Sequence, residues 1–480
     1  MYKQRFLLDS DGGNFFIFAL TDDPEGDIRR EVSRLPKNVT TYLLCPNAGG
    51  AFYNPTKIGD IYKPAVELVN AFERSEDPFD TFLSEVKRSG RETMITYRMN
   101  DVHEADKADS PMTATFKKQN PKLTVGYAEL GEEFFSGKKL PWMKYCLNYE
   151  EPDVQEYILS IFEELCKYDI DGLQLDWMRF PCHLPGTPDE VWEKREVLTN
   201  FTEKVRAVLD NNGKGRILSA RVPTTLKGCH DLGIDLVDWT KSGLIDFVTL
   251  SPFLTTDIVI RAEEIKDQIG SVIPVYTAIE FDNARQPHTP ESLRATALSM
   301  SEAGSDGIYM FNFPCWTEYV AMTPYNWLEG LDYDEGRTEK PLNFVISYNK
   351  YRTDVDMPAQ LPKTASASGG EAAFTLQMPP KALPAADALI LVQAKAKDMM
   401  EVSINGIILK QLKKSRQHDL FVGFLNAYNP KEGGYIADDK SEIHIFRITQ
   451  DVLNPGVWNI IIKNTGAEPF DITRMNIGLW

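Results

Sequence analysis

The feature that most constrains the fold is an alternation of short apolar runs with amphipathic segments, which continues to about Lys340. Strands are predicted at residues 14–20, 39–45, 92–99, 172–176, 217–222, 247–251, 274–280 and 307–313. Helices are predicted at residues 25–35, 78–89, 153–168, 189–211, 232–242, 260–269 and 291–303. Eight strands that alternate with helices predict an α/β fold, a (β/α)8 TIM barrel over residues 1–340. A doubly wound sheet would usually have a glycine-rich turn after its first strand, and TDDPEG after Leu20 is not one.

The pattern changes over residues 341–480, where short alternating runs are separated by turn residues and no long helix is predicted. The runs include AAFTLQM, ALILVQAKA, MEVSINGIIL, IHIFRI, WNIIIKN and ITRMNIGLW. Alternation of this kind predicts an antiparallel β-sandwich domain after the barrel. Pro, Ser, Ala and Gly cluster at residues 358–370, which is where a linker is expected.

Composition excludes several classes of protein. The 480 residues include 70 acidic and 52 basic residues, and the resulting net charge of −18 disfavours binding to nucleic acid or to an anionic membrane. No apolar run is long enough to span a membrane. The N-terminus shows no signal peptide, so we expect a cytoplasmic protein if Met1 is the native start, and a periplasmic or secreted one if a signal was removed.

The cysteines and histidines do not predict a metal site. None of the six cysteines has a CxxC partner or a histidine at a zinc-ligand interval. Buried thiols are therefore expected, and no cofactor or metal is indicated.

Two long insertions follow predicted strands, at residues 46–77 and 100–151. Loops of this length in a compact domain are usually functional. Both leave the carboxyl ends of their strands, so we expect them to form one wall of a pocket.

The segment DIDGLQLDWMRFP, which begins at Asp169, places an acid at a strand end. The helix pattern at residues 153–168 leads into Asp171-Gly172, and residues 173–176 read as a short strand that ends at Asp176. Ligands of parallel α/β proteins bind at that end of the strands. Asp176 is therefore either a catalytic carboxylate or a structural residue, which acts as a cap or forms a salt bridge with Arg179.

Polar and aromatic residues also occur at the ends of the other predicted strands. Period-two counting places Asp176, Arg221, Ser251 and Glu280 on the inward face, where a packed barrel would carry Val, Ile and Leu. The candidate substrate-binding residues are Arg98, Asn100, Asp101, His103, Trp177, Arg179, Arg221, Ser251, Asn312 and Trp316. Trp177, Phe253 and Trp316 are candidates to stack on sugar faces, and a core or rim position explains each equally well.

Two carboxylates across a pocket are the minimal equipment for glycosidic cleavage, because one protonates the leaving oxygen and the other attacks the anomeric carbon or activates water. Asp176 and Glu280 are predicted to be this pair. We expect a retaining mechanism with Asp176 as nucleophile and Glu280 as acid/base, and the reverse assignment remains open. For Glu280 the structural alternative is an ion pair with an arginine.

Three arginines at adjacent strand ends, Arg98, Arg179 and Arg221, have two interpretations. They either keep the carboxylates ionised or bind an anionic group of the substrate, such as a sulfate or a uronate. Because Arg98 lies beside His103 and the second insertion, it is the arginine that separates these interpretations.

The motif formed by Asp171, Gly172, Asp176, Arg179, Phe180 and Pro181 resembles the glycosyl-hydrolase-10-like barrels of bacteria. The resemblance covers the barrel and implies carbohydrate hydrolysis with Asp176 as an active-site acid. The C-terminal part is similar to galactose-binding-like β-sandwiches, through VSINGIIL and NPGVWNIIIKN. The resulting hypothesis is a glycoside hydrolase that acts on a poly- or oligosaccharide. The main alternative is a non-catalytic glycan-binding barrel. A lyase or aldolase is less favoured, because none of the predicted strands ends in a lysine that could form a Schiff base.

Overall fold

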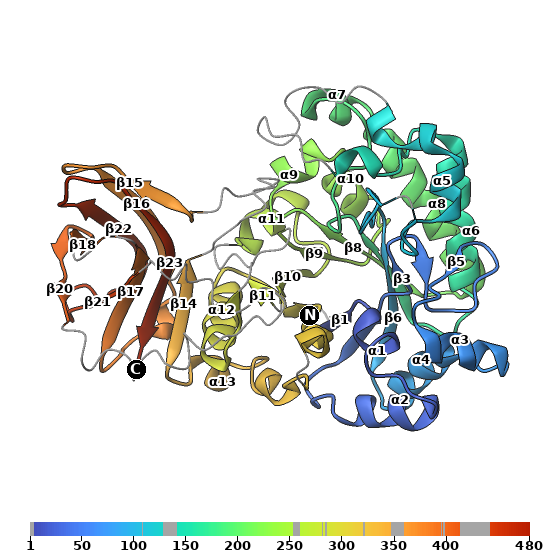
Figure 1. The fold of residues 1–480 in the computed structure, drawn as a ribbon, viewed down its shortest axis with the longest axis horizontal. Coiled ribbons are helices and arrows are strands. Elements are labelled where there is room, and N and C mark those ends of the chain that lie inside the picture. Colours follow the sequence, from blue (N-terminus) through green and yellow to red (C-terminus); the bar gives the residue numbers. More distant parts are fainter. Residues whose placement is uncertain are drawn as a thin grey trace.

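The computed structural model describes residues 4–107, 109–127, 142–252, 260–280, 282–283, 286–319, 322–346, 360–394, 396, 399–412 and 442–480. Eight parallel strands form a closed barrel in the order β1-β13-β10-β9-β8-β7-β6-β2 (Figure 1). Their bounds are β1 Phe6–Ser10, β2 Thr41–Leu44, β6 Glu92–Arg98, β7 Gly172–Asp176, β8 Ile217–Val222, β9 Phe247–Leu250, β10 Val275–Glu280 and β13 Ile308–Phe311. The predicted barrel is confirmed.

Helices cover the outside of the barrel (Figure 1). The main ones are α2 Pro24–Ser33, α4 Pro78–Arg88, α6 Pro152–Leu165, α7 Pro188–Glu193, α8 Glu196–Asn212, α9 Leu226–Asp231, α10 Leu236–Lys241, α11 Ala262–Ile269 and α12 Pro290–Glu302. Several begin at a side-chain cap and a proline; Asp77, for example, accepts hydrogen bonds from the first-turn amides of α4. The single helix predicted at residues 189–211 is two helices, α7 and α8.

The first strand was predicted in the wrong place. Residues 13–16 form the short helix α1 (Gly13–Phe16), and the strand is Phe6–Ser10, which pairs with β2 and β13. Between them Gly12 has φ 74°, and a Cβ there would lie 2.5 Å from the Cys45 carbonyl oxygen, so the turn requires glycine. The run FFIFAL misleads because periodicity does not separate a short apolar strand from a buried helical segment.

Both insertions lie after the carboxyl ends of their strands. The first contains β3 Asn47–Ala48, β4 Ala51–Phe52, β5 Asp60–Ile61 and α3 Val66–Glu73. The second contains α5 Thr115–Gln119 and the 3-10 turns η1 Pro121–Leu123, η2 Val125–Tyr127 and η3 Met143–Tyr145. Asn100 ties the second insertion to the barrel, since its side chain accepts from Leu147 N at 2.8 Å and donates to Leu147 O at 3.0 Å.

Antiparallel sheets follow the barrel, as predicted. One contains β14, β23, β17, β21 and β20 with β15 beside β23, and the other contains β16, β22, β18 and β19. Their bounds are β14 Leu342–Ile346, β15 Lys363–Ala365, β16 Glu371–Met378, β17 Ala388–Ala394, β18 Met400–Ile404, β19 Ile407–Ile408, β20 Lys410–Gln411, β21 Glu442–Arg447, β22 Gly456–Asn464 and β23 Phe470–Leu479. The β18–β19 turn has positive φ at Asn405 and Gly406, which is typical of a two-residue hairpin. Parts of the predicted linker lie outside the described residues.

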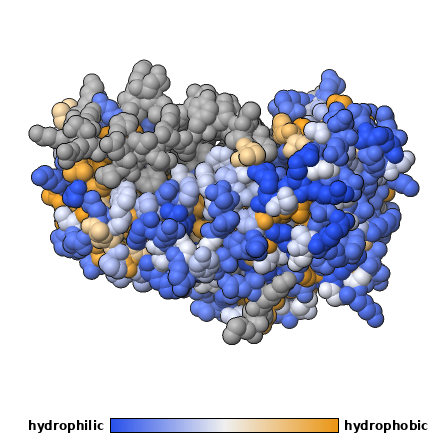
Figure 2. Space-filling model, turned by 90° about the horizontal axis from the view of Figure 1, so that it is seen from below, coloured by the Kyte–Doolittle hydropathy of each residue, from blue (hydrophilic) through white to orange (hydrophobic). Residues whose placement is uncertain are grey.

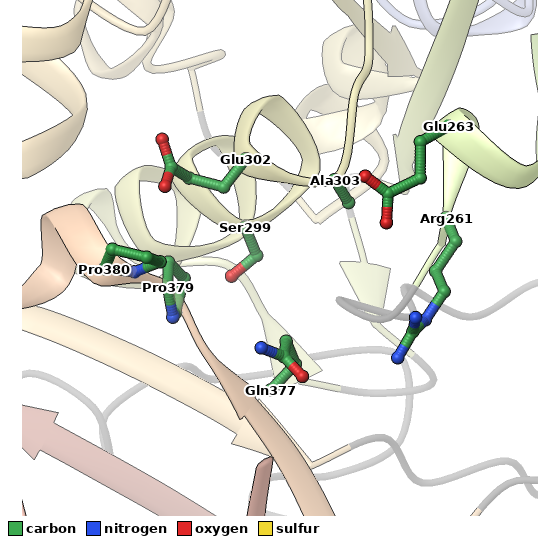
Figure 3. A pocket seen from close by; sticks show the side chains of 8 residues that line it. All are labelled: Arg261, Glu263, Ser299, Glu302, Ala303, Gln377, Pro379 and Pro380. Atoms are coloured by element: carbon green, nitrogen blue, oxygen red, sulfur yellow. The ribbon is translucent and has the colours of Figure 1, made fainter. Parts of the chain in front are cut away.

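The sandwich packs against the barrel through α12, which lies beside β14 (Figure 1). Ala295 and Leu298 of α12 belong to the apolar core of the sandwich. A cavity of about 140 Å³ lies between α12, the start of α11 and β16, from which Gln377 extends toward it (Figure 3). Ligand pockets usually hold about 300–1,000 Å³, so this cavity is a gap in the domain contact.

The six cysteines are buried and free, as expected. No helix in the described part of the chain is long and apolar enough to cross a membrane. Hydrophilic side chains cover most of the barrel surface drawn in Figure 2, and hydrophobic ones appear in small separate groups.

Candidate active site

Arg221 connects two acids at the carboxyl end of the barrel. Its Nη1 lies 2.9 Å from Asp176 Oδ1 and 3.0 Å from Oδ2, and its Nη2 lies 3.3 Å from Glu280 Oε1. Asp176 ends β7, Glu280 ends β10, and Arg221 lies on β8. The structure therefore brings the two predicted catalytic carboxylates onto one guanidinium, with Asp176 and Arg221 each 1% exposed and Glu280 3% exposed.

Further contacts fix the position of this cluster. The Arg221 guanidinium lies 3.6 Å from the centre of the Phe311 ring, where the ring face attracts the cation. Asp176 Oδ1 also accepts hydrogen bonds from the backbone amides of Met178 at 3.0 Å and Arg179 at 3.1 Å. Hydrogen bonds from backbone amides to a carboxylate belong to the stronger, charge-assisted kind. Asp176 is thus oriented by the turn that follows its own strand.

Asp9, Tyr309 and Gln174 form a buried polar group inside the barrel. The Tyr309 hydroxyl lies 2.7 Å from Asp9 Oδ2 and 2.6 Å from Gln174 Oε1. Burial raises the pKa of Asp9 to about 7; the hydrogen bond from Tyr309 opposes this rise, and the charge of Asp176 adds to it. One hydroxyl proton cannot serve two acceptors, and a protonated Asp9 supplies the second. Asp9 is therefore readily protonated, and so uncharged, next to the ion-paired cluster of Asp176, Arg221 and Glu280.

A second polar chain runs from Arg98 to Arg179. Asp101 Oδ2 accepts from Arg98 Nη1 at 3.1 Å, and Asp101 Oδ1 lies 2.5 Å from His103 Nδ1. Burial opposes ionisation of Asp101, but His103 and then Arg98 hold the pKa of its carboxyl well below the ordinary value. His103 Nε2 lies 2.8 Å from Arg179 Nη2. Because arginine only donates, Nε2 accepts this bond and Nδ1 donates to Asp101.

Arg179 differs from the other two arginines in its partners. Arg221 is bound to two acids, and Arg98 is bound to Asp101, with an oxygen of Asp11 3.9 Å away. Arg179 is 9% exposed, and it forms no ion pair with a carboxylate in the described part of the chain. Burial, and then the charge of Arg98, lower the pKa of Arg179. The charges of Asp101 and Glu280 oppose this fall. A buried guanidinium that is not paired with an acid is costly unless another anion reaches it.

The backbone around Arg179 is also unusual. Phe180 has φ 57°, a left-handed conformation that is rare for a bulky side chain. Its ring lies 5.3 Å from the Arg179 guanidinium and 4.9 Å from the His103 ring. Unfavourable backbone conformations are concentrated at functional sites.

The remaining predicted residues do not all face the acids. Trp177 is fully buried among Tyr149, His183 and Trp239, so it offers no face to a sugar. Asn100 is occupied by the insertion, and Ser251 donates to the Pro252 carbonyl at 3.2 Å.

Two other candidate residues, Asn312 and Trp316, contact Arg98 and Trp327. Asn312 Oδ1 accepts from Arg98 at 3.5 Å, and Trp316 packs edge-on against Trp327 with the ring centres 5.5 Å apart. Phe253 lies outside the described residues.

Asp9, Tyr309 and Phe311 are parts of the site that were not predicted from the sequence. Asp9 was missed because the first strand was assigned to residues 14–20, although FLLDS has the apolar run and the strand-end acid that mark such a site. Among the described residues, no group of three or more His, Cys, Asp or Glu side chains is arranged to hold a metal ion.

No protein-family model matches the sequence, and no curated protein matches it. Solved structures with some similarity include the glycoside hydrolase domain of PgaB (BpsB) from Bordetella bronchiseptica, with 14% identity, 66% of this chain and 96% of that chain covered, and a TM-score of 0.44. An α-galactosidase from Thermus thermophilus shares 10% identity over 72% of this chain and 63% of that one, with a TM-score of 0.39. An α-amylase from Lactobacillus plantarum shares 12% identity over 95% and 98%, with a TM-score of 0.41. Similarity of this extent assigns no activity to this chain.

Proposed function

We propose that this protein is a glycoside hydrolase that cleaves a poly- or oligosaccharide with Asp176 and Glu280. The observation that carries the proposal is the pair of carboxylates on one guanidinium at the carboxyl end of the barrel. Active sites of (β/α)8 barrels lie at this end, and glycosidic cleavage requires two carboxyl groups. The proposal also agrees with the resemblance of the Asp171–Pro181 motif to glycosyl-hydrolase-10-like barrels.

The proposed mechanism is retaining. Glu280 protonates the glycosidic oxygen while an oxygen of Asp176 attacks the anomeric carbon, which breaks the bond to the leaving sugar and forms a glycosyl ester. Glu280 then accepts a proton from water, and the water oxygen displaces Asp176. Asp176 suits the nucleophile because two amides and Arg221 support its charge. The shared contact with Arg221 supports a close pair of acids, which is the arrangement that retention uses.

A non-catalytic glycan-binding barrel is the second candidate. The favouring observation is that both oxygens of Asp176 lie within 3.0 Å of Arg221 Nη1, as in a structural ion pair. In that case the two acids hold Arg221 in place and perform no chemistry.

We also propose that the glycan carries an anionic group that binds Arg179. From the sequence, Arg98 is the arginine expected to separate anion binding from pairing with the acids, and in the structure Arg98 is bound to Asp101. Arg179 is a buried cation that forms no ion pair with a described carboxylate, and a sulfate or uronate group would pair with it through a two-pronged contact.

Substitution of the two acids tests the proposal. After a glycan has been found that the wild-type protein cleaves, Asp176→Asn and Glu280→Gln should each lower turnover at least about 100-fold, the usual contribution of acid–base catalysis. Thermal unfolding of each variant serves as the control for folding. Folded variants that cleave at the wild-type rate would refute the assignment. A wild-type protein that binds glycans but cleaves none would favour the binding barrel.

A further inference from the structure

A cavity lined by lysines lies in the second insertion, apart from the two acids. Its volume is about 410 Å³, within the range of about 300–1,000 Å³ that is usual for small-molecule sites. Lys107, Lys117, Lys118 and Lys144 line it, together with neutral residues. Four cations and no acid among the described lining residues are unexpected in a chain with 70 acidic and 52 basic residues.

The four ammonium groups differ in what they contact. Lys107 Nζ lies 2.5 Å from Glu104 Oε1, Lys118 Nζ donates to the Ser110 carbonyl at 3.0 Å, and Lys144 Nζ lies 4.8 Å from the centre of the Tyr145 ring. Lys117 has no side-chain hydrogen bond or ion pair in the described part of the chain. Lys117 is half-buried, and desolvation lowers the pKa of its ammonium, which the charge of Asp101 opposes. A partly buried ammonium with no ion pair is costly, and a bound anion would reduce that cost.

The cavity is held next to the candidate active site. Asn100, which follows β6, binds both backbone groups of Leu147, two residues after the lining residue Tyr145. Ala105, also in the lining, follows His103 by two residues, and His103 contacts Arg179. The cavity is thus tied to the candidate active site through Asn100 and through the stretch from His103 to Ala105.

We propose that this lysine cavity is a second anion subsite, which binds a sulfate or carboxylate group on another sugar of the same glycan. The inference rests on the proposed function and deepens it, because two separate cationic sites indicate a substrate with repeated negative charges. The overall charge of −18 repels such a substrate at long range. The local cations that line the cavity are therefore what would hold it.

Titration with single sugars tests the subsite without requiring turnover. Glucose 6-sulfate and glucuronate carry the two candidate anions, and glucose is the neutral analogue. In ligand-observed NMR titrations of the wild-type protein, at least one anionic sugar should bind, and glucose should bind at least about tenfold more weakly. The anion that binds more tightly identifies the group as sulfate or carboxylate. Equal binding of glucose, or no binding of either anion, would overturn the proposal.

Variants locate the binding. Lys117→Met should weaken the anionic sugar about tenfold or more, the scale of one lost bond to a charged group. Lys144→Met is a second lining variant in case the first does not fold. Lys122→Met is the matched control, because Lys122 is exposed in η1 and does not line the cavity. Equal weakening by Lys122→Met would show diffuse attraction and would contradict the subsite. If the anionic sugar binds as expected but no glycan is hydrolysed, the assignment of Asp176 and Glu280 as catalytic residues is wrong and the anion subsite still stands.

Discussion

Replacing Asp9 with Asn should change how stability depends on pH. The pKa of Asp9 is raised from 3.8 to about 7 in the folded protein, so between these values the folded state holds a proton that the unfolded state has released. Raising the pH from about 4 to above 7 therefore destabilises the wild-type protein progressively. At about 1.36 kcal/mol per pH unit, the full effect is about 4 kcal/mol. Asn cannot ionise, and its amide can donate to Tyr309 as the protonated acid does.

The assay is urea unfolding of the barrel, followed by tryptophan fluorescence from pH 4.5 to 8. Between pH 4.5 and 8 the free energy of unfolding of Asp9→Asn should rise relative to that of the wild type by about 3 kcal/mol and level off above pH 7. Asp210→Asn is the control, because the Asp210 side chain is 52% exposed and its pair with Arg206 should contribute about 1 kcal/mol or less. If the free energies of unfolding of Asp9→Asn and the wild type differed by the same amount at every pH, Asp9 would not be a neutral acid in the folded protein.

Three other perturbations test the account. Arg221→Met should lower the free energy of unfolding by about 3–5 kcal/mol, because it leaves two buried acids without their cation; the exposed Arg29→Met should cost about 1 kcal/mol or less, and equal losses in urea unfolding would contradict this role. Arg179→Met should weaken binding of an anionic glycan by about 1.5–3 kcal/mol and binding of a neutral analogue much less. Arg98→Met should weaken binding of both glycans alike. If calorimetry showed the reverse pattern for the two variants, Arg98 would be the residue that binds the anion. A chain that ends at Lys340 should keep the Asp176–Arg221 contact but aggregate, because Ala295 and Leu298 become exposed to solvent. A truncated protein that is folded and monomeric by light scattering but inactive would show that the sandwich contributes to the site.

Much of the barrel could be predicted because its strands are short, apolar and bounded by helices. The ranges 172–176 and 217–222 agree with β7 and β8 residue for residue. Period-two counting from these strands placed Asp176 and Arg221 on the same inward face, where they contact one another. The first strand was misplaced because a continuous apolar run has no period, and Asp9 was lost with it.

The partners within the site could not be predicted, since they depend on the path of the insertion. The sequence shows three arginines at adjacent strand ends, but not that Asp101 turns back to bind Arg98. Nor does it show that Asn100 is used to bind Leu147 or that the Trp177 ring packs into the core. These outcomes come from long-range packing, which a local pattern does not encode. The lysine cavity was missed for the same reason, because its lysines are up to 37 residues apart in the chain (Lys107 to Lys144).

The most direct test of the central claim is cleavage of a glycan in water enriched in oxygen-18, followed by mass spectrometry of the products. Hydrolysis through Asp176 and Glu280 places one oxygen-18 atom at each new reducing end, because water displaces the enzyme from the anomeric carbon. The label should appear with the wild-type protein and be lost in folded Asp176→Asn and Glu280→Gln variants. An unlabelled, unsaturated product, or a label that persists in both variants, would contradict glycoside hydrolysis by this pair.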